Sequence, residues 1–299
     1  MFVFGIVFHK ITNPLKYTIA KLSKSKRNII ILLLDKKASD SVYSEIKEFT
    51  RDFKNVIFAP RISVNWARFS LTLAPLSMMK IACNYEFKYF SLISGDDIPI
   101  MSNDEMNKFL DISYKNQSEF IGYTPDVHKK HSSVNPYWRL QIDFPNLFFA
   151  RKKGYLAKFK RGFIYLYLFL FKRKNLDQIP PLYKGCNWFT ISNHAISYIF
   201  SYLQNNSRYA ETFENSYCSD EMFFQTILFN SEFRKHIFGI DKKIPDCEMA
   251  LRNIDWETGP EYPKIFTEED FYRLKKSKLL FARKIKSDIS IDTLIEYFG

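Results

Sequence analysis

The sequence predicts an α/β fold in which helices flank a Rossmann-like sheet. Residues 2–8 and 28–34 are continuously apolar runs bounded by polar residues, a pattern typical of buried parallel strands. Between them, residues 15–23 space their apolar side chains as a helix does. The chain therefore opens with a β-α-β unit, which is typical of nucleotide-binding α/β proteins.

The pattern continues through the first half of the chain and then becomes irregular. Further elements are predicted in this order: a helix at 41–53, a strand at 55–58, a helix at 69–84 and a strand at 89–93. Polar loops then enclose a basic, aromatic helix, and two more helices follow at 192–203 and 220–229. We expect one domain over residues 1–299. Its first half, to about residue 120, should bind a nucleotide, and the more irregular second half runs from about residue 121.

Composition narrows the class of partner. The chain has 299 residues, 46% of them hydrophobic and 25% charged, which is ordinary for a globular protein. Its net charge of +12 would attract nucleic acid, anionic membrane or phosphorylated ligands. The sequence contains no RNP-type motif or zinc-finger spacing, and the positive charge is spread along the chain. We therefore expect no nucleic-acid partner.

The four cysteines are widely separated. Cys83, Cys186, Cys218 and Cys247 include no CxxC pair. This spacing argues against a zinc site or a disulfide framework and suits a reducing compartment. The first residues, MFVFGIVFHK, lack the basic region and cleavage site of a signal peptide and are interpreted as a strand. The expected location is the cytoplasm.

One stretch could place the protein on the inner face of the cytoplasmic membrane. The longest apolar run, 162–171, has ten residues, about half of what a membrane-spanning helix needs. Basic residues flank it at 158–161 and 172–174. A short helix of this kind could lie on an anionic bilayer surface. Its apolar residues continue all round the helix, which fits burial in the core equally well.

Carboxylates follow two of the predicted strands. Ligands bind beyond the carboxyl ends of strands in open α/β sheets, and Asp35 and the pair Asp96-Asp97 lie there. Asp35 could hydrogen-bond a base or ribose, or cap its loop. Asp96 and Asp97 could hold a divalent cation, or belong to a turn in which Asp caps and Pro99 fixes φ. Spacing alone leaves both choices open.

Three further charged residues have a functional and a structural interpretation. Glu221 follows Ser219 and Asp220 at the start of a predicted helix, where acids suit the helix dipole, but it could also act as a general base. Arg252 and Lys284 each lie in an apolar-aromatic frame. They could neutralise a pyrophosphate in place of a metal ion, or be ordinary surface cations.

Seven segments in order resemble the core-2/I-branching N-acetylglucosaminyltransferase and peptide O-xylosyltransferase family. They are LLLDKK (32–37), VNWARFSL (64–71), YFSLISGDDIP (89–99), GCNWFTIS (185–192), YCSDEMFFQTILFNS (217–231), LRNIDW (251–256) and LLFARKI (279–285). The resemblance covers most of the chain, and seven such segments in the family's order and spacing are highly specific.

The resemblance implies a GT-A-type fold with a mixed sheet, a UDP-sugar donor and no metal. It implies these roles: Glu221 as catalytic base, Arg252 and Lys284 as pyrophosphate ligands, Asp35 as uridine ligand, and Asp97 with Pro99 as the Asp-x-Pro after the fourth strand. We expect inverting transfer, of N-acetylglucosamine first, to a glycan hydroxyl in bacterial surface polysaccharide synthesis. The alternatives are xylose or another sugar, or a catalytically inactive scaffold.

The chain departs from the family in ways that bear on the acceptor. The vertebrate members have a membrane anchor and many disulfides, and we expect neither in this chain. The chain therefore resembles a bacterial, cytoplasmic member. The family's Trp-Gly is here Trp66-Ala67. Trp138 and Arg139 lie in the region comparable to the acceptor site. Trp188 and Trp256 could stack on sugars or pack in the core. The acceptor glycan could be lipid-linked.

Overall fold

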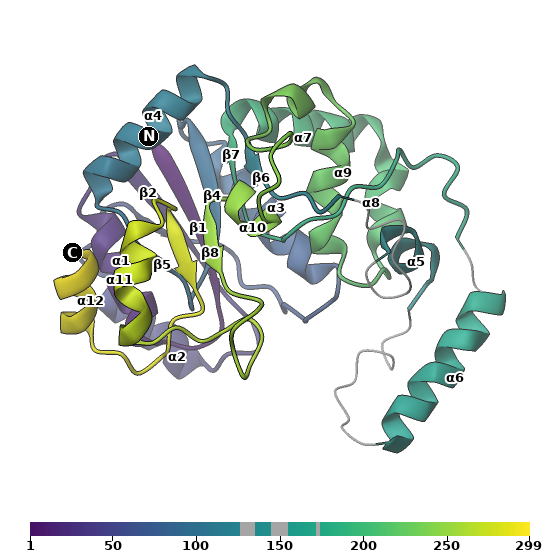
Figure 1. The fold of residues 1–299 in the computed structure, drawn as a ribbon, viewed down its shortest axis with the longest axis horizontal. Helices are drawn as coiled ribbons and strands as arrows, with labels where there is room; N and C mark the ends of the chain where they lie inside the picture. The colour runs from purple at the N-terminus through teal and green to yellow at the C-terminus, as the bar shows by residue number, and fades with distance from the viewer. Residues whose placement is uncertain (126–134, 145–154, 172–173) are drawn as a thin grey trace.

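The computed structural model describes residues 1–125, 135–144, 155–171 and 174–299, and its centre is a six-stranded sheet in the order β3-β2-β1-β4-β7-β6 (Figure 1). Its strands are β1 (Phe2–Phe8), β2 (Asn28–Leu34), β3 (Val56–Phe58), β4 (Tyr89–Ser94), β6 (Phe120–Ile121) and β7 (Phe189–Ser192). The first four run parallel, whereas β7 is antiparallel to both β4 and β6. This mixed sheet confirms the predicted α/β fold class.

The apolar runs that open the chain form the buried middle of this sheet. β1 and β2 pair in register from Phe2 with Asn28 to Phe8 with Leu34. Because successive side chains of a strand point to opposite faces, Phe4 packs into the hydrophobic cluster on one face and Val3 into the cluster on the other. Both faces of these strands are therefore buried, as the continuous apolar runs predicted.

Helices cover both faces of the sheet. Buried residues of α1 (Asn13–Ser23), α2 (Asp40–Phe49) and α4 (Asn103–Lys115) belong to one cluster. Those of α3 (Ser70–Ala82), α7 (Asn193–Asn205) and α9 (Phe223–Phe229) belong to the other. The remaining helices are α5 (Pro136–Gln141), α6 (Tyr155–Phe171), α8 (Ser207–Phe213), α10 (Asp246–Met249), α11 (Glu268–Lys276), α12 (Ile291–Phe298) and the 3₁₀ turns η4 (Ser219–Glu221) and η5 (Glu232–His236).

A second, three-stranded sheet carries the C-terminal part of the chain to the end of β4. Its order is β5 (Ile98–Pro99), β9 (Phe281–Arg283) and β8 (Arg252–Ile254). β9 pairs with β5 just beyond the Ser94–Asp97 turn. β7, from the second half, likewise joins the first-half sheet through β4. The two predicted halves thus share both sheets.

Helix α6 lies at the edge of the molecule, beyond α5 (Figure 1). Leu168 on its inner face is buried against Ile142 and Phe144, whereas Phe159 and Phe163 on its outer face are 83% and 70% exposed. The helix is therefore not buried all round. Among the described residues no helix is long and apolar enough to cross a membrane. The predicted basic flanks at 172–173, and the side chains of 158 and 161, lie outside the described residues.

Candidate active site

The predicted carboxylates lie at the expected edge of the main sheet. Asp35 directly follows β2, and Asp97 lies three residues beyond the end of β4. β1 separates these two strands in the sheet. The carboxyl ends of parallel strands are where ligands bind in open α/β sheets, so this edge is the candidate nucleotide site.

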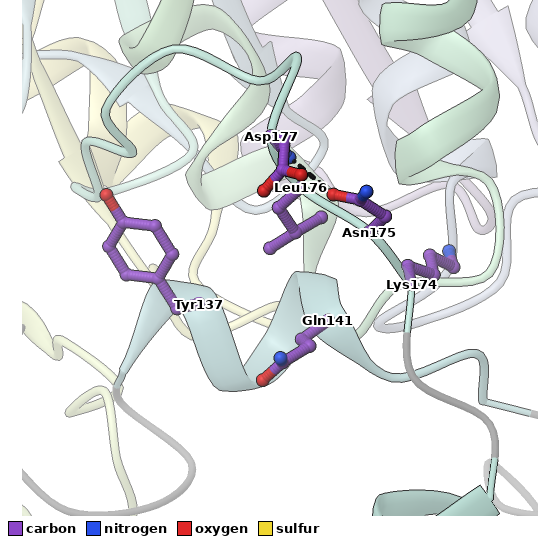
Figure 2. Close-up of a pocket in the computed structure, with 6 residues that line it drawn as sticks. All are labelled: Tyr137, Gln141, Lys174, Asn175, Leu176 and Asp177. Atoms are coloured by element: carbon purple, nitrogen blue, oxygen red, sulfur yellow. Dashed lines mark hydrogen bonds between the residues drawn. The ribbon is translucent and has the colours of Figure 1, made fainter.

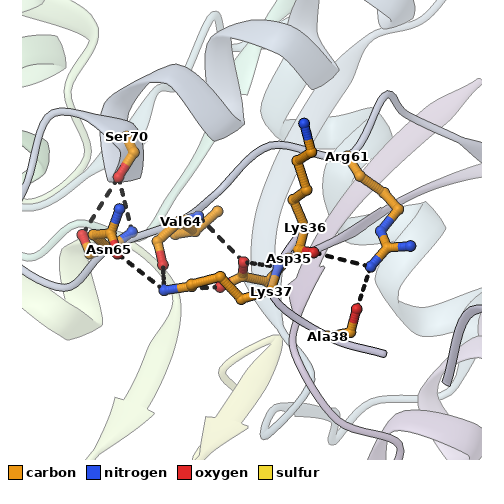
Figure 3. Close-up of polar contacts among 8 residues, drawn as sticks. All are labelled: Asp35, Lys36, Lys37, Ala38, Arg61, Val64, Asn65 and Ser70. Carbon is orange, nitrogen blue, oxygen red and sulfur yellow. Dashed lines mark hydrogen bonds and ion pairs between the residues drawn. The ribbon is translucent and has the colours of Figure 1, made fainter. Parts of the chain in front are cut away.

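Asp35 joins two loops at this edge (Figure 3). Its Oδ1 accepts hydrogen bonds from the backbone N–H groups of Lys37 at 2.9 Å and Val64 at 3.4 Å, and the Lys37 ammonium lies 3.4 Å from Oδ2. Lys37 Nζ also donates to the Val64 carbonyl at 2.6 Å. Asp35 therefore caps the loop after β2. A contact between Asp35 and uridine stays a prediction.

Asp97 is fully buried and anchors the second sheet. Its carboxylate accepts from the backbone N–H of Ser94 at 2.9 Å and the Ser94 hydroxyl at 2.6 Å, and forms an ion pair with Arg283 at 3.2 Å. Burial raises the pKa of Asp97, and Arg283 and the Ser94 hydrogen bonds offset part of that rise. The carboxylate of Asp97 is thus already occupied by protein groups.

Arg252 has no exposed surface. Its guanidinium donates to the carbonyls of Ala250 at 2.7 Å, Leu92 at 2.9 Å and Phe189 at 3.1 Å, and lies 4.5 Å from the ring centre of Phe281. In this structure the side chain of Arg252 ties β8 to β4 and β7. The predicted direct contact with pyrophosphate is not available to it in this arrangement.

The neighbouring cations Arg283 and Lys284 are more accessible than Arg252. The Arg283 side chain is 13% exposed, and its guanidinium lies 4.1 Å from the ring centre of Trp188. Trp188 is 9% exposed, so Arg283 covers one face of its indole. Lys284 is half-buried, and within the described residues its ammonium forms no ion pair. The predicted pyrophosphate ligand Lys284 therefore remains open to an anion.

Glu221 lies in a 3₁₀ turn and not in the first turn of a helix. η4 ends at Glu221, and Met222 has φ of −131°, which separates the turn from α9. The prediction of one helix over 220–229 capped by Ser219 was wrong, because the Ser219 hydroxyl instead hydrogen-bonds that of Thr72, 2.9 Å away. The helix dipole predicted to stabilise the Glu221 carboxylate is replaced by two cations.

These cations are Arg139 and Lys184. Arg139 Nη1 lies 2.6 Å and Lys184 Nζ 3.0 Å from Oε2 of Glu221. Burial alone would raise the pKa of Glu221, but the charges of Lys184 and Arg139 outweigh it and hold that pKa below its ordinary value. The Glu221 side chain remains 29% exposed. Glu221 is therefore an ionised carboxylate that solvent can reach.

The adjacent Asp220 has the opposite electrostatic environment. It is buried, and burial together with the charge of Glu221 raises its pKa to about 7. Two neighbouring carboxyl groups whose pKa values are pushed apart are a recurring feature of acid–base sites. Here the exposed member of the pair holds the negative charge, so Glu221 is the member able to accept a proton.

Aromatic side chains connect this pair to α6. The Trp138 ring lies 4.9 Å from that of Tyr165 on α6, 5.5 Å from that of Phe144 and 6.5 Å from that of Tyr217. The Arg139 guanidinium lies 5.4 Å from the Tyr217 ring. Trp138 thus packs in a small core at the edge of the candidate site. The predicted contacts of Trp138 and Arg139 with an acceptor stay predictions.

The segment 184–188 connects the two parts of the candidate site. Lys184 pairs with the Glu221 side chain, and the Gly185 N–H donates to the Glu221 carbonyl at 3.0 Å. Trp188, three residues later, packs on Arg283. The segment 184–188 therefore contacts Glu221 at one end and Arg283 at the other. Among the described residues, Glu221 forms no direct contact with Arg283 or Lys284.

The loop before α3 holds the other side of the Glu221 turn. The backbone N–H of Cys218 donates to the Ala67 carbonyl at 3.0 Å. Ala67 has φ of 61°, in the left-handed region that favours glycine. This backbone conformation explains why the family that the sequence resembles has glycine at this position.

A hollow of about 410 Å³ lies beside α5 (Figure 2). Tyr137 and Gln141 of α5 face residues 174–177 across it. The hollow is wide open, and Glu221 does not line it. The third tryptophan predicted to contact a sugar, Trp256, lies elsewhere and is 56% exposed.

Sequence reasoning missed Lys184, Arg283 and Asp220 as members of the candidate site. Lys184 directly precedes the GCNWFTIS segment, and Arg283 lies inside LLFARKI. Their positions in or beside the motifs were a usable signal. The ion pairs around Glu221 could not be predicted, because Lys184 and Arg139 reach Glu221 from segments 37 and 82 residues away.

Comparison with known proteins matches most of the chain to a family model. The family model described as Core-2/I-Branching enzyme matches residues 2–275. A comparison with curated protein sequences finds no significant match. Among solved structures, TarS 1–349 of S. aureus is similar at a TM-score of 0.37 and 9% identity, and the mannosyltransferase Ktr4p of S. cerevisiae at 0.25 and 11%. Each similarity covers 77% of this chain but only 56% and 58% of those structures, and neither is strong enough to inform function.

Proposed function

Because the chain belongs to the Core-2/I-branching enzyme family and is a glycosyltransferase with a GT-A-type fold, we propose an inverting, metal-independent transfer. The donor is a UDP-sugar, with N-acetylglucosamine as the first candidate for the sugar. The acceptor is a hydroxyl of a glycan in bacterial surface polysaccharide synthesis. The proposal is carried by one observation: Glu221 is ionised, solvent-accessible and fixed by Arg139 and Lys184.

In the proposed reaction Glu221 is the general base. The acceptor hydroxyl gives its proton to the Glu221 carboxylate while its oxygen attacks the anomeric carbon of the donor. The bond from that carbon to the phosphate oxygen breaks, and its electron pair leaves with UDP. A single displacement of this kind inverts the anomeric configuration. Arg139 and Lys184 position the carboxylate and keep it ionised in the ground state.

Protein cations stabilise the departing UDP in this proposal. Lys284 and Arg283 meet the pyrophosphate, and the buried Arg252 adds positive charge behind them. Preorganised charges of this kind replace the charge of a metal ion. Asp97 is a poor ligand for a divalent cation because Arg283 and Ser94 already occupy its oxygens. This geometry supports a donor site without a metal.

The proposed acceptor is lipid-linked, and α6 brings the enzyme to it. The exposed outer face of α6 carries Phe159, Phe163, Leu166 and Leu170, which share one side of the helix. Its inner face packs on Trp138, the neighbour of Arg139. A helix lying on an anionic bilayer would therefore present membrane-bound glycans close to Glu221.

Substitution of the base tests the proposal. Glu221→Gln removes the proton acceptor but keeps the shape of the side chain, so turnover should fall by about 10²–10⁴-fold. Binding of the donor should remain nearly unchanged, because Glu221 is proposed to contact the acceptor. A thermal-shift panel of UDP-sugars identifies the best donor, and release of UDP from it measures turnover.

Glu232→Gln is the matched control, since the Glu232 carboxylate is exposed and forms only a long surface pair with Lys235. Its turnover should equal that of the unmodified protein. Near-normal turnover of Glu221→Gln would show that another group is the base. A panel in which no UDP-sugar binds would argue for the scaffold alternative, and strongest binding of UDP-xylose would change the proposed sugar.

A further inference from the structure

Two of the four cysteines, far apart in sequence, meet at one place. Cys186 precedes β7, and Asp246 and Cys247 begin α10. The two sulfurs and a carboxylate oxygen of Asp246 all lie within 4.8 Å of one another. In the described part of the chain this is the one group of three or more Cys, His, Asp or Glu side chains with such a geometry. Cys186 lies in the segment 184–188 that borders the candidate active site, whereas Asp246 and Cys247 lie outside that site.

The surrounding residues orient these side chains. The Thr124 hydroxyl donates to Oδ2 of Asp246 at 3.0 Å. The Cys186 thiol points toward the Asp246 carbonyl at 3.5 Å. Gly122 closes one side so tightly that a Cβ there would lie 2.9 Å from the Cys186 sulfur. The cluster is therefore enclosed, with Cys247 buried and Asp246 half-buried.

We propose that Cys186, Cys247 and Asp246 bind a thiophilic divalent cation, with Zn²⁺ as the foremost candidate. Thiolate and carboxylate ligands suit Zn²⁺, with Zn–S of about 2.3 Å and Zn–O of about 2.0 Å. A tetrahedral site with these bonds separates its ligand atoms by roughly 3.5–3.8 Å. The three side chains need to close by about 1.3 Å at most. A water molecule completes the shell.

The charges balance at this site. On binding, each thiol releases its proton to solvent, and two thiolates and one carboxylate around the cation leave a net charge of −1. The buried guanidinium of Arg252 interacts electrostatically with both cysteines and carries the compensating positive charge.

The ion would act as a cross-link and not as a catalyst. It would join the segment 184–188, which holds Glu221 through Lys184 and Gly185, to α10, which leads into β8 and Arg252. Binding of a metal by the folded state alone raises stability by mass action. This inference does not depend on the proposed donor, acceptor or base.

Cobalt provides a direct spectroscopic test. Metal-free protein is titrated with Co²⁺ in the presence of a non-coordinating reductant, and the near-ultraviolet charge-transfer band of thiolate–cobalt bonds is measured. The unmodified protein should bind one equivalent with this band, and Zn²⁺ should displace it. Cys186→Ser and Cys247→Ser should lose the band. Asp246→Asn should keep it but bind at least about tenfold more weakly, since the amide is a poorer ligand.

Cys83→Ser is the matched control, because Cys83 is exposed and lies outside the cluster. Its titration should match that of the unmodified protein. Failure of the unmodified protein to give the band, or an equal band in Cys186→Ser, would overturn the proposal. A mass two hydrogens lower without reductant, with no metal uptake when reduced, would show that the pair forms a disulfide instead. Because Cys186 is half-exposed, its serine variant gives a result even if Cys247→Ser does not fold.

Discussion

At the scale of single residues, Glu119 shows how the fold holds a buried carboxylate. Glu119 is 2% exposed and accepts a hydrogen bond from the Ser192 backbone N–H at 2.8 Å, and it also bonds the Ser192 hydroxyl. Within the described residues it has no ion-pair partner. Burial raises the pKa of Glu119 to about 7, although the bonds from Ser192 oppose that rise.

The pKa of Glu119 predicts the direction of a stability change with pH. The folded state binds the proton more tightly than the unfolded state, whose pKa is close to 4.5. The contribution of Glu119 to the free energy of unfolding should therefore be fully present below the unfolded pKa and be lost as pH rises toward about 7. The full loss is about 3 kcal/mol at most. Urea unfolding of Glu119→Gln at about pH 5 and about pH 8 should show much less of this dependence, because the amide does not titrate.

Glu48→Gln is the control for this measurement, since the Glu48 side chain is 68% exposed in a surface pair with Arg51. It should lose stability with pH as the unmodified protein does. If Glu119→Gln followed the same course, another group would be responsible.

At the scale of elements, α6 differs from every helix that covers the sheet. Of those helices, α9 is buried throughout, and α3 and α4 each expose one large apolar residue, Leu73 and Ile112. Helix α6 instead exposes four on one side: Phe159, Phe163, Leu166 and Leu170. Exposed apolar faces of this extent are characteristic of interaction sites. The position of α6 at the edge of the molecule leaves this face accessible (Figure 1).

Flotation with vesicles measures whether this face binds membrane. The protein should float with vesicles that contain anionic lipid and remain at the bottom with neutral ones, because the chain carries a net charge of +12. Replacement of Phe159 and Phe163 by Ser should weaken partitioning at least about tenfold, since each buried aromatic side chain contributes about 1.5–3 kcal/mol. Tyr272→Ser, at an exposed position of α11, should have no effect.

An unmodified protein that stays at the bottom with anionic vesicles would contradict the membrane proposal. Flotation that persists in the double variant would assign the contact to another surface.

At the scale of the whole molecule, the candidate site is assembled from segments that are distant in sequence. β9 brings Arg283 and Lys284 beside Asp97, almost two hundred residues earlier in the chain. α5 and the segment before β7 bring Arg139 and Lys184 to Glu221. The excess of cations around this edge is a property of the fold, and it is what the proposed metal-independent reaction requires.

Chelation tests that property. With EDTA present, the initial rate of transfer should stay within about twofold, because protein cations stabilise the leaving group. Strict dependence on Mn²⁺ would contradict this and would make Asp96 and Asp97 candidate ligands again. Cys186→Ser is the control, because its thiol cluster is already disrupted. A loss of rate that EDTA causes by removing a metal from that cluster should therefore be absent in this variant.

Much of the first half could be predicted from local pattern. The runs at 2–8 and 28–34 became β1 and β2 with the same bounds, because both faces of a central parallel strand are buried. α4 was missed although Ser102 and Glu105 form its capping box. β8 and β9 were missed because three-residue strands have too few residues to show a period.

By itself the sequence determined the α/β class, the strands that open the chain and the residues that mark the family, because hydrophobic periodicity and motif order are properties of short segments. Only the tertiary structure decided which charges meet. It buried Arg252 against backbone carbonyls, placed Arg139 and Lys184 on Glu221, and brought Cys186 close to Cys247. Burial and Coulomb interactions depend on distance in space, and separation along the chain does not contain that information.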